Sequence, residues 1–313
     1  MSKKKPFRKN RKGKPKKNMP IPQGMEKTMA DLTRLLAEQE FQSMDEANAF
    51  MENLMKSGQP IPSQQAQSPL QEAQNIMYDA WEAPNKRQRI KLARKALSIS
   101  EDCADAYVHL AEESARSLEQ ARELYEEGVQ AGERALGTEI FTEMAGHFWG
   151  VFETRPYMRA RAELASCLWE LGEYDEAIDQ YQEMLRLNPM DNQGLRYTLL
   201  LCLLDEDRGK ELEQLLADFD DDASALWLYT RALNMFHKQG ASKRAVTSLK
   251  EALKFNPYVP DYLLGAKRLP LDLPPYMSFG DELEAAQYAV EASHMWLREA
   301  GAIDWLRQVS SEM

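Results

Sequence analysis

The chain has 313 residues, of which 43% are hydrophobic and 28% are charged, and its formal net charge is −11. This length and composition allow a sizeable buried core and one to three domains. No apolar run approaches the roughly 18 residues of a membrane span, and the basic start lacks the apolar stretch of a secretory signal. We therefore expect neither feature.

Residues 1–24 are predicted to form a disordered basic arm, because they are rich in Lys, Arg and Pro. The first 17 positions hold ten of the 39 basic residues and no acid, which leaves 29 basic and 50 acidic residues for the remainder. Such an arm attracts nucleic acid, a ribosome or anionic lipid, or only keeps the chain soluble. The candidate anion-binding residues are Lys3, Lys4, Lys5, Arg8, Lys9, Arg11, Lys12, Lys14, Lys16 and Lys17.

Residues 25–56 are predicted to form a small helical hairpin. The apolar stripe of its first helix consists of Met25, Met29, Leu32, Leu35 and Leu36. The second helix opens with a capping box over residues 43–46. Methionine surfaces can repack around varied partners, although such a stripe also serves as a plain packing face. Residues 57–69 contain three prolines and four glutamines and indicate a linker, so we expect a flexibly tethered hairpin.

Residues 158–191 match a tetratricopeptide unit, a helical hairpin of about 34 residues with small and large apolar residues at fixed places. Those places hold Leu164-Ala165, Gly172, Ala177 with Tyr181, and Asn188-Pro189. The alanines allow close helix crossing, Gly172 allows a turn, and Pro189 ends the second helix. One such hairpin cannot bury its own apolar faces, so neighbouring repeats are required.

Neighbouring repeats are predicted throughout residues 70–257. Helices are expected over 70–82, 86–99 and 119–136, and a divergent pair over 192–222. Residues 223–257 repeat the central unit at an offset of 68 residues, twice the repeat length, since Gly240, Ala245 and Asn256-Pro257 correspond to Gly172, Ala177 and Asn188-Pro189. The predicted fold class is therefore all-α, a tetratricopeptide-type solenoid of helical hairpins.

An aromatic insertion interrupts the array at residues 137–156. Phe148, Trp149 and Phe152 either line the inner wall of the groove or form a functional loop. Residues 258–313 are predicted to be a Pro-rich strap followed by capping helices, the first of which begins after Asp281. These helices would close the exposed end of the array.

The C-terminal third resembles the closing segment of the suppression of tumorigenicity 7 family, and the resemblance covers roughly residues 70–307. The residues that carry it are Phe255, Asn256, Pro257, Val259, Pro260, Tyr262, Leu263, Leu264, Gly280, Asp281, Ala285, Trp296, Gly301 and Ala302. The phrases GHFWG, ETRPYMRAR and LNP resemble those of soluble bacterial relatives. The family implies tetratricopeptide scaffolding without a catalytic residue. Animal members resemble membrane proteins with N-terminal spans, which this chain replaces with its arm and hairpin.

No catalytic or metal-binding constellation is recognisable in the sequence. The four histidines lack metal-ligand spacing, and no phosphate-binding glycine loop or nucleophile elbow occurs. Cys103, Cys167 and Cys202 are odd in number and far apart, which is typical of reduced, buried thiols in a cytosolic protein. We therefore predict a cytoplasmic protein that is not an enzyme and uses no cofactor.

The remaining prediction concerns a partner-binding groove lined by the first helix of each hairpin. The groove candidates are Arg155, Arg159, Glu163, Ser166, Glu170, Gln193, Arg196, Tyr197 and His109. The arginines would bind carboxylates or backbone carbonyls of a partner, or pair with Glu153, Glu163 or neighbouring acids within the array. The resulting hypotheses are an adaptor that binds proteins in this groove and, as the alternative, an RNA- or ribosome-associated factor anchored by residues 1–17.

Overall fold

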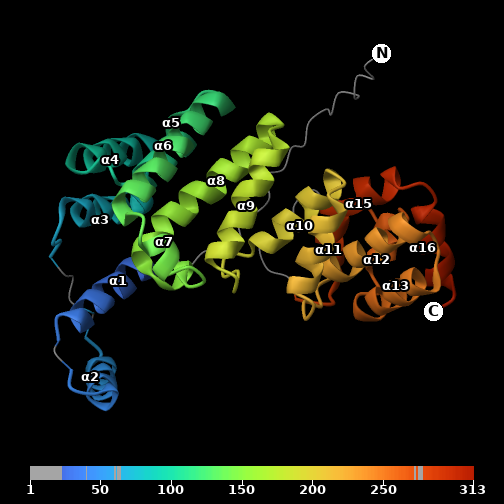
Figure 1. Ribbon diagram of the computed structural model, residues 1–313, viewed down its shortest axis with the longest axis horizontal. Coiled ribbons are helices and arrows are strands. Elements are labelled where there is room, and N and C mark those ends of the chain that lie inside the picture. Colours follow the sequence, from blue (N-terminus) through green and yellow to red (C-terminus); the bar gives the residue numbers. More distant parts are fainter. Residues whose placement is uncertain (1–22, 40, 60, 62–64, 271–272, 274–277) are drawn as a thin grey trace. The chain divides into compact units, whose positions relative to one another are not determined.

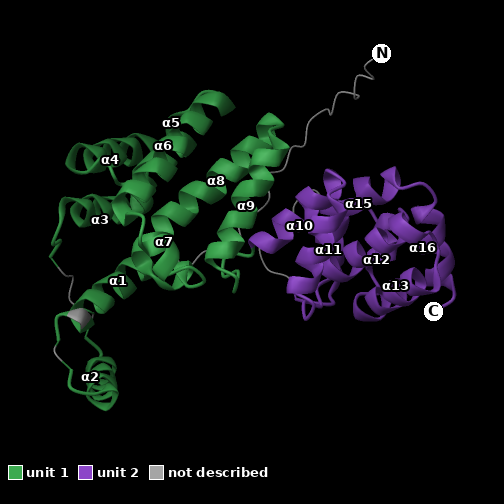
Figure 2. Cartoon of the chain, viewed as in Figure 1, with its two compact units in different colours: residues 1–194 green, residues 195–313 purple. Residues whose placement is uncertain are grey.

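A computed structural model describes residues 23–39, 41–59, 61, 65–270, 273 and 278–313. The predicted arm lies outside this part of the chain except for residues 23 and 24, as do residues 271–272 and 274–277 of the predicted strap. Within the described residues there are 16 α-helices, two short 3-10 helices and no strand. The all-α prediction is confirmed. The chain divides into two compact units, residues 1–194 and 195–313 (Figure 1, Figure 2).

Unit 1 contains three helical hairpins that follow two N-terminal helices. Its helices are α1 (Gln23–Ala37), α2 (Met44–Ser57), α3 (Pro69–Glu82), α4 (Lys86–Ile99), α5 (Ala104–Ser114), α6 (Leu118–Leu136), α7 (Ile140–Glu143), α8 (Arg155–Leu171) and α9 (Tyr174–Leu187). The hairpins are α3–α4, α5–α6 and α8–α9, and successive hairpins pack on one another. We call the first helix of each hairpin its A helix and the second its B helix.

The central hairpin, α8–α9, has the residues that a tetratricopeptide unit requires. Gly172 ends α8 in the left-handed conformation with φ 85°, which a side chain would strain. Ala165 and Ala177 are fully buried, as expected where two helices cross closely. The small residues and the turn therefore stand where the sequence predicted them, and the hairpin stacks on α6 and α5.

The aromatic insertion packs against the central hairpin. It contains α7 and two 3-10 helices, η1 (Phe148–Gly150) and η2 (Phe152–Thr154). The ring of Phe148 is fully buried and lies 6.2 Å from the ring of Tyr157 on α8. The backbone N–H of Gly146 donates to the carbonyl of Leu187 at the end of α9, over 3.0 Å. The insertion thus holds the start of α8 in place.

Unit 2 contains two further hairpins and two closing helices. Its helices are α10 (Leu195–Asp205), α11 (Gly209–Asp218), α12 (Ala225–Gln239), α13 (Lys243–Phe255), α14 (Val259–Leu263), α15 (Glu282–Arg298) and α16 (Ala302–Ser311). The A helices are α10 and α12. Asp281 caps α15 as predicted, because its carboxylate accepts from the backbone N–H of Glu284 at 2.8 Å.

The closing helices share one hydrophobic core with the second hairpin of unit 2. Trp296 on α15 is fully buried and stacks with Trp305 on α16, their ring centroids lying 6.2 Å apart. The indole N–H of Trp296 donates to the hydroxyl of Tyr288 at 2.7 Å. Both helices pack on repeat helices, α15 on α12 and α16 on α13, and so cover apolar faces of the hairpins.

The N-terminal helices α1 and α2 differ in how they contact unit 1. Helix α1 packs against α3, and its Glu26 is 2% exposed. Helix α2 opens with the predicted capping interaction between Ser43 and Glu46 but buries no residue. Helix α1 is therefore docked on unit 1, and the flexible tethering of the hairpin stays a prediction. The predicted stripe also differs, since Met25 and Met29 are exposed whereas Glu26 and Ala30 are buried.

Candidate functional site

Four charged side chains from three helices meet on the A helices of unit 1. Arg159 on α8 donates from Nη1 to both carboxylate oxygens of Glu26 on α1, at 3.1 and 3.0 Å. Its Nε donates to Asp105 on α5 at 2.8 Å. Nη1 of Arg155, one turn earlier on α8, lies 3.5 Å from the carboxylate of Glu26. We call Glu26, Asp105, Arg155 and Arg159 the arginine cluster.

The aromatic insertion surrounds Arg155, the more constrained of the two arginines. Its guanidinium lies 4.1 Å from the ring centroid of Phe152 and 5.1 Å from that of Trp149. Its Nε donates to the carbonyl of Trp149 at 3.0 Å. Burial lowers the pKa of Arg155, although the carboxylate of Glu26 opposes this shift. The positive charge of Arg155 is thus buried away from water, and a carboxylate beside it is needed to offset the cost of that burial.

Burial also opposes the charge of Arg159, but the carboxylates of Asp105 and Glu26 outweigh it and raise the pKa of this guanidinium. Trp81 on α3 adds a cation–π contact, with the guanidinium 5.3 Å from its ring. The neighbouring Tyr78 hydroxyl has its pKa raised by burial and by the charges of Glu26 and Asp105. All three A helices of unit 1 therefore either supply a residue of the cluster or, in the case of α3, contact it through Trp81.

The other predicted groove residues of unit 1 lie on α5 and α8, except for Gln193, which follows α9. Glu163 and Ser166 are half-buried and Glu170 is exposed, and with Arg159 they form one stripe along α8. His109 on α5 is 3% exposed, and neither ring nitrogen has a hydrogen-bond partner. Burial lowers the pKa of His109 against the opposing charges of Glu112 and Glu113. The half-buried Gln193 follows α9 near the end of unit 1.

In unit 2 the predicted residues Arg196 and Tyr197 converge on Asp222. The Nε of Arg196 and the hydroxyl of Tyr197 donate to one carboxylate oxygen of Asp222, at 2.9 and 2.8 Å. The guanidinium of Arg196 also lies 4.4 Å from the Tyr197 ring. The predicted arginines therefore all contact acids within their own units, which is one of the two alternatives. These acids include Glu26, Asp105 and Asp222.

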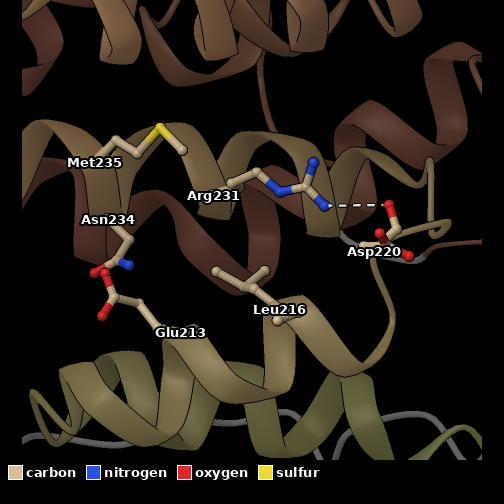
Figure 3. A pocket seen from close by; sticks show the side chains of 7 residues that line it. Glu213, Leu216, Asp220, Arg231, Asn234 and Met235 are labelled. Atoms are coloured by element: carbon tan, nitrogen blue, oxygen red, sulfur yellow. Dashed lines mark hydrogen bonds between the residues drawn. The ribbon is translucent and has the colours of Figure 1, made fainter.

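A shallow hollow of about 350 Å³ lies between α11 and α12 of unit 2 (Figure 3). Arg231 crosses it and donates to the carbonyl of Asp220 at 3.5 Å. A second hollow, of about 370 Å³, continues from Arg231 and Met235 toward α13, where Lys243 and Arg244 lie. The two hollows share Arg231 and Met235 of α12, and charged side chains of both signs line them. Sequence reasoning did not single out these residues.

The sequence analysis also missed Glu26, the acid that joins the two arginines. Glu26 is separated from Arg159 by 133 positions, and it directly follows Met25, the first residue of a stripe that looks like an ordinary apolar face. A local signal was nevertheless present, since Glu26 and Ala30 are one turn apart and can enter a contact together.

Buried thiols and the absence of metal clusters complete the description of the site. All three cysteines are buried and unbridged, as predicted. Burial raises the pKa of Cys103 to about 12 and that of Cys167 to about 11, so neither thiol is activated at neutral pH. In the described part of the chain, no group of His, Cys, Asp and Glu side chains forms a metal site. Nor does any described helix combine the length and apolarity that crossing a bilayer requires.

The stacked hairpins, with small residues at the helix crossings and charged clusters on the A helices, define a helical repeat protein of the tetratricopeptide type. The structure of YrrB, described as a TPR protein with an unusual peptide-binding site, aligns with a TM-score of 0.42 and 18% identity, over 59% of this chain and 84% of that one.

The family model described as ST7 protein matches residues 63–313, and the chain belongs to this family. The human Suppressor of tumorigenicity 7 protein-like is 31% identical over 263 residues, which is 76% of this chain and 45% of that protein. The Drosophila melanogaster Protein ST7 homolog is 31% identical over 258 residues, covering 75% and 48%. The chain thus spans about half the length of these curated relatives. The resemblance read from the C-terminal third is confirmed.

Proposed function

We propose that the protein is a non-enzymatic scaffold that holds protein partners along its A helices and acts in the cytoplasm. One observation carries this proposal. Arg159 of α8 binds Glu26 of α1, a helix that lies outside the repeats and also packs on α3. The guanidinium of Arg159 is in turn held by Trp81 on α3 and Asp105 on α5. The surface therefore has the chemistry to hold a helical segment. Three buried, unbridged thiols favour a reducing compartment.

The proposed partner-contacting residues are those of the A-helix stripes. Arginine suits the task because its guanidinium presents forked donors to a carboxylate or to backbone carbonyls. Half-buried residues beside it supply contact area at little cost in side-chain entropy. The proposed set is Arg155, Arg159, Glu163, Ser166 and Glu170 on α8, His109 on α5, Gln193 after α9, and Arg196 and Tyr197 on α10.

Selection of peptides on the purified full chain tests this function. A display library of helix-forming peptides should yield binders, and hydrogen exchange should show protection by them on α3, α5 and α8 or on α10 and α12. Binders that protect only the B helices α4, α6, α9 and α13, or the failure of the library to yield any binder, would contradict the proposal. Substituting Arg159 and Arg196 by Ala should weaken peptides mapped to their respective units.

A second candidate function rests on the basic arm and its charge contrast with the acidic remainder of the chain. We propose that residues 1–17 anchor the protein to RNA or to a ribosome. Binding through phosphates weakens steeply with salt, with a slope of about −0.7 per contacted phosphate in log affinity against log salt. The full chain should therefore bind single-stranded RNA with a steep salt slope that deletion of residues 1–17 removes. Equal binding by both proteins would contradict the anchor.

A further inference from the structure

Helix α1 is held by charge and by few apolar contacts. Ala30 and Leu32 are buried and Leu35 and Leu36 are half-buried, while Met25 and Met29 are 56% and 40% exposed. Its neighbour α2 buries no residue and so adds no core. Glu26 is the residue that pairs α1 with α8, since its carboxylate contacts both arginines. A helix attached in this way can leave without opening the hydrophobic core behind it.

When α1 leaves, the part of the arginine cluster on α5 and α8 still favours binding of a carboxylate. Asp105 continues to pair with Arg159. Arg155, by contrast, contacts Glu26 as its acid, and its Nη1 has no hydrogen-bond partner. Trp149 and Phe152 stack against the guanidinium and restrict its access to water. An exposed site would thus present an uncompensated positive charge framed by aromatic rings, which favours an incoming carboxylate.

We propose that the arginine cluster is a binding site for an acidic amphipathic helix of a partner protein, and that α1 occupies it in cis until such a helix displaces it. The inference rests on the proposed scaffold function and deepens it by naming the partner class. The partner helix carries a glutamate that reaches Arg155 and Arg159, with a small residue one turn later, as Ala30 follows Glu26. The match to the family model begins at residue 63, so α1 lies outside it whereas Asp105, Arg155 and Arg159 lie within it.

In this arrangement, the site is available only in the fraction of molecules in which α1 is displaced. A partner competes with a helix of the same chain. Its apparent affinity therefore equals its intrinsic affinity multiplied by the fraction of molecules in which α1 is displaced. Weakening α1 by substitution should raise the apparent affinity without any change in the site itself. Weakening the arginines should abolish binding of both helices. These two opposite responses separate displacement from simple loss of a surface.

The test uses the full chain and a labelled peptide that spans residues 23–37. Short helices are marginal in water, so the peptide is stapled through positions 25 and 29, which are exposed and one turn apart. The Glu26→Gln protein should bind this peptide at least about tenfold more tightly than wild type, because the internal competitor is weakened. Glu52→Gln, on the exposed face of α2, is the matched control and should bind like wild type. Adding Arg159→Ala to Glu26→Gln should remove binding.

Three outcomes would overturn the displacement proposal. Equal binding by wild type and Glu26→Gln would show that α1 does not compete, and binding by neither would show that the cluster does not accept a helix in trans. A stapled peptide carrying Glu26→Gln that binds as well as the native one would show that the carboxylate is not recognised. Peptides selected from the library could still protect the A helices in each case, so failure here is distinguishable from failure of the scaffold function.

Hydrogen exchange supplies a second readout in the same variants. In the Glu26→Gln protein, amides of α1 should exchange faster while those of α8 keep their protection, because the core of the central hairpin does not depend on α1. If α8 lost protection together with α1, then α1 would be an integral part of the fold and the proposal would be overturned.

Discussion

Two buried glutamates, one in each unit, join a helix outside the repeats to the repeat hairpins. Glu26 of α1 is 2% exposed and Glu284 of α15 is 3% exposed. The carboxylate of Glu26 contacts arginine side chains. That of Glu284 accepts from the backbone N–H groups of Ala225 and Gly280, at 2.8 and 2.7 Å, and from the amide of Asn256 at 2.9 Å.

The donors around Glu284 are neutral, and two of the three are backbone N–H groups. One of these is the first N–H of α12, where the helix dipole favours an anion. Helix α15 also buries a full apolar face that includes Tyr288 and Trp296. Helix α1 has neither feature, since its partners are long side chains and its apolar burial is slight. The comparison indicates that similar burial of one carboxylate can secure a permanent part of the fold in unit 2 and an exchangeable helix in unit 1.

The largest effect is expected from Glu284→Ala. This change leaves the backbone N–H groups of Ala225 and Gly280 without their acceptor, at about 1 to 3 kcal/mol each, so unit 2 should lose roughly 2 to 6 kcal/mol of unfolding free energy. Urea unfolding with hydrogen exchange of α12 and α15 measures the loss. Glu282→Ala, at the exposed start of the same helix, is the control and should change little. A mild effect of Glu284→Ala would remove the distinction between the two glutamates.

Glu26→Ala should have a smaller effect that is confined to α1. Hydrogen bonds to charged groups contribute about 1.5 to 3 kcal/mol each, and the penalty is limited because water can reach Arg159 once α1 has left. Exchange rates of α1 amides should rise, while the urea midpoint of the α8–α9 hairpin stays within error of wild type. Global unfolding of unit 1 at a lower urea concentration would contradict an exchangeable α1.

A pH-dependent effect is expected from His109. Because burial lowers its folded-state pKa below the unfolded value of 6.5, the unfolded chain binds the proton first. The stability tied to neutral His109 is thus complete above pH 6.5 and is lost as the pH falls through the folded pKa. The charged groups that face the ring are Glu112, Glu113, Arg89 and Asp105.

The His109→Leu variant should lose less stability than wild type as the pH falls. The substitution sacrifices no hydrogen bond, because neither ring nitrogen has a partner. In thermal unfolding, the difference in stability between wild type and variant should be larger at pH 5 than at pH 8. An unchanged pH profile would show that His109 does not titrate between the folded and unfolded states.

The smallest effect is expected from Met55→Ser on α2. Met55 is 76% exposed and α2 buries no residue, so the unfolding free energy should change by less than about 0.5 kcal/mol. Thermal unfolding checks this, and a larger loss would indicate that α2 packs on unit 1. Together with Glu26→Ala, it separates what α1 contributes from what α2 contributes.

The repeat hairpins could be predicted from the sequence because their determinants are local. Gly172, Ala165 and Ala177 act within one hairpin, and the offset of 68 residues placed the divergent pair α10–α11 without further information. The cap at Asp281 and the buried thiols follow from the same short-range patterns.

The arginine cluster could be predicted only in part. Arg155 and Arg159 stand out as charges on an A helix, but their acid comes from a helix 133 positions away from Arg159, and no periodicity connects them. The N-terminal stripe was misread because methionine at helical spacing usually indicates a buried face, whereas here burial of Glu26 is offset by ion pairs. The sequence shows that Glu26 and Ala30 lie one turn apart, but it does not show which side chains they contact.

A crystal structure of the Glu26→Gln protein with the stapled peptide of residues 23–37 tests the central claim most directly. The account predicts that the glutamate of the peptide lies between Arg155 and Arg159, against Trp81 and the aromatic insertion, with the chain's own α1 displaced. A peptide bound elsewhere while α1 stays in place on α3, α5 and α8 would contradict it.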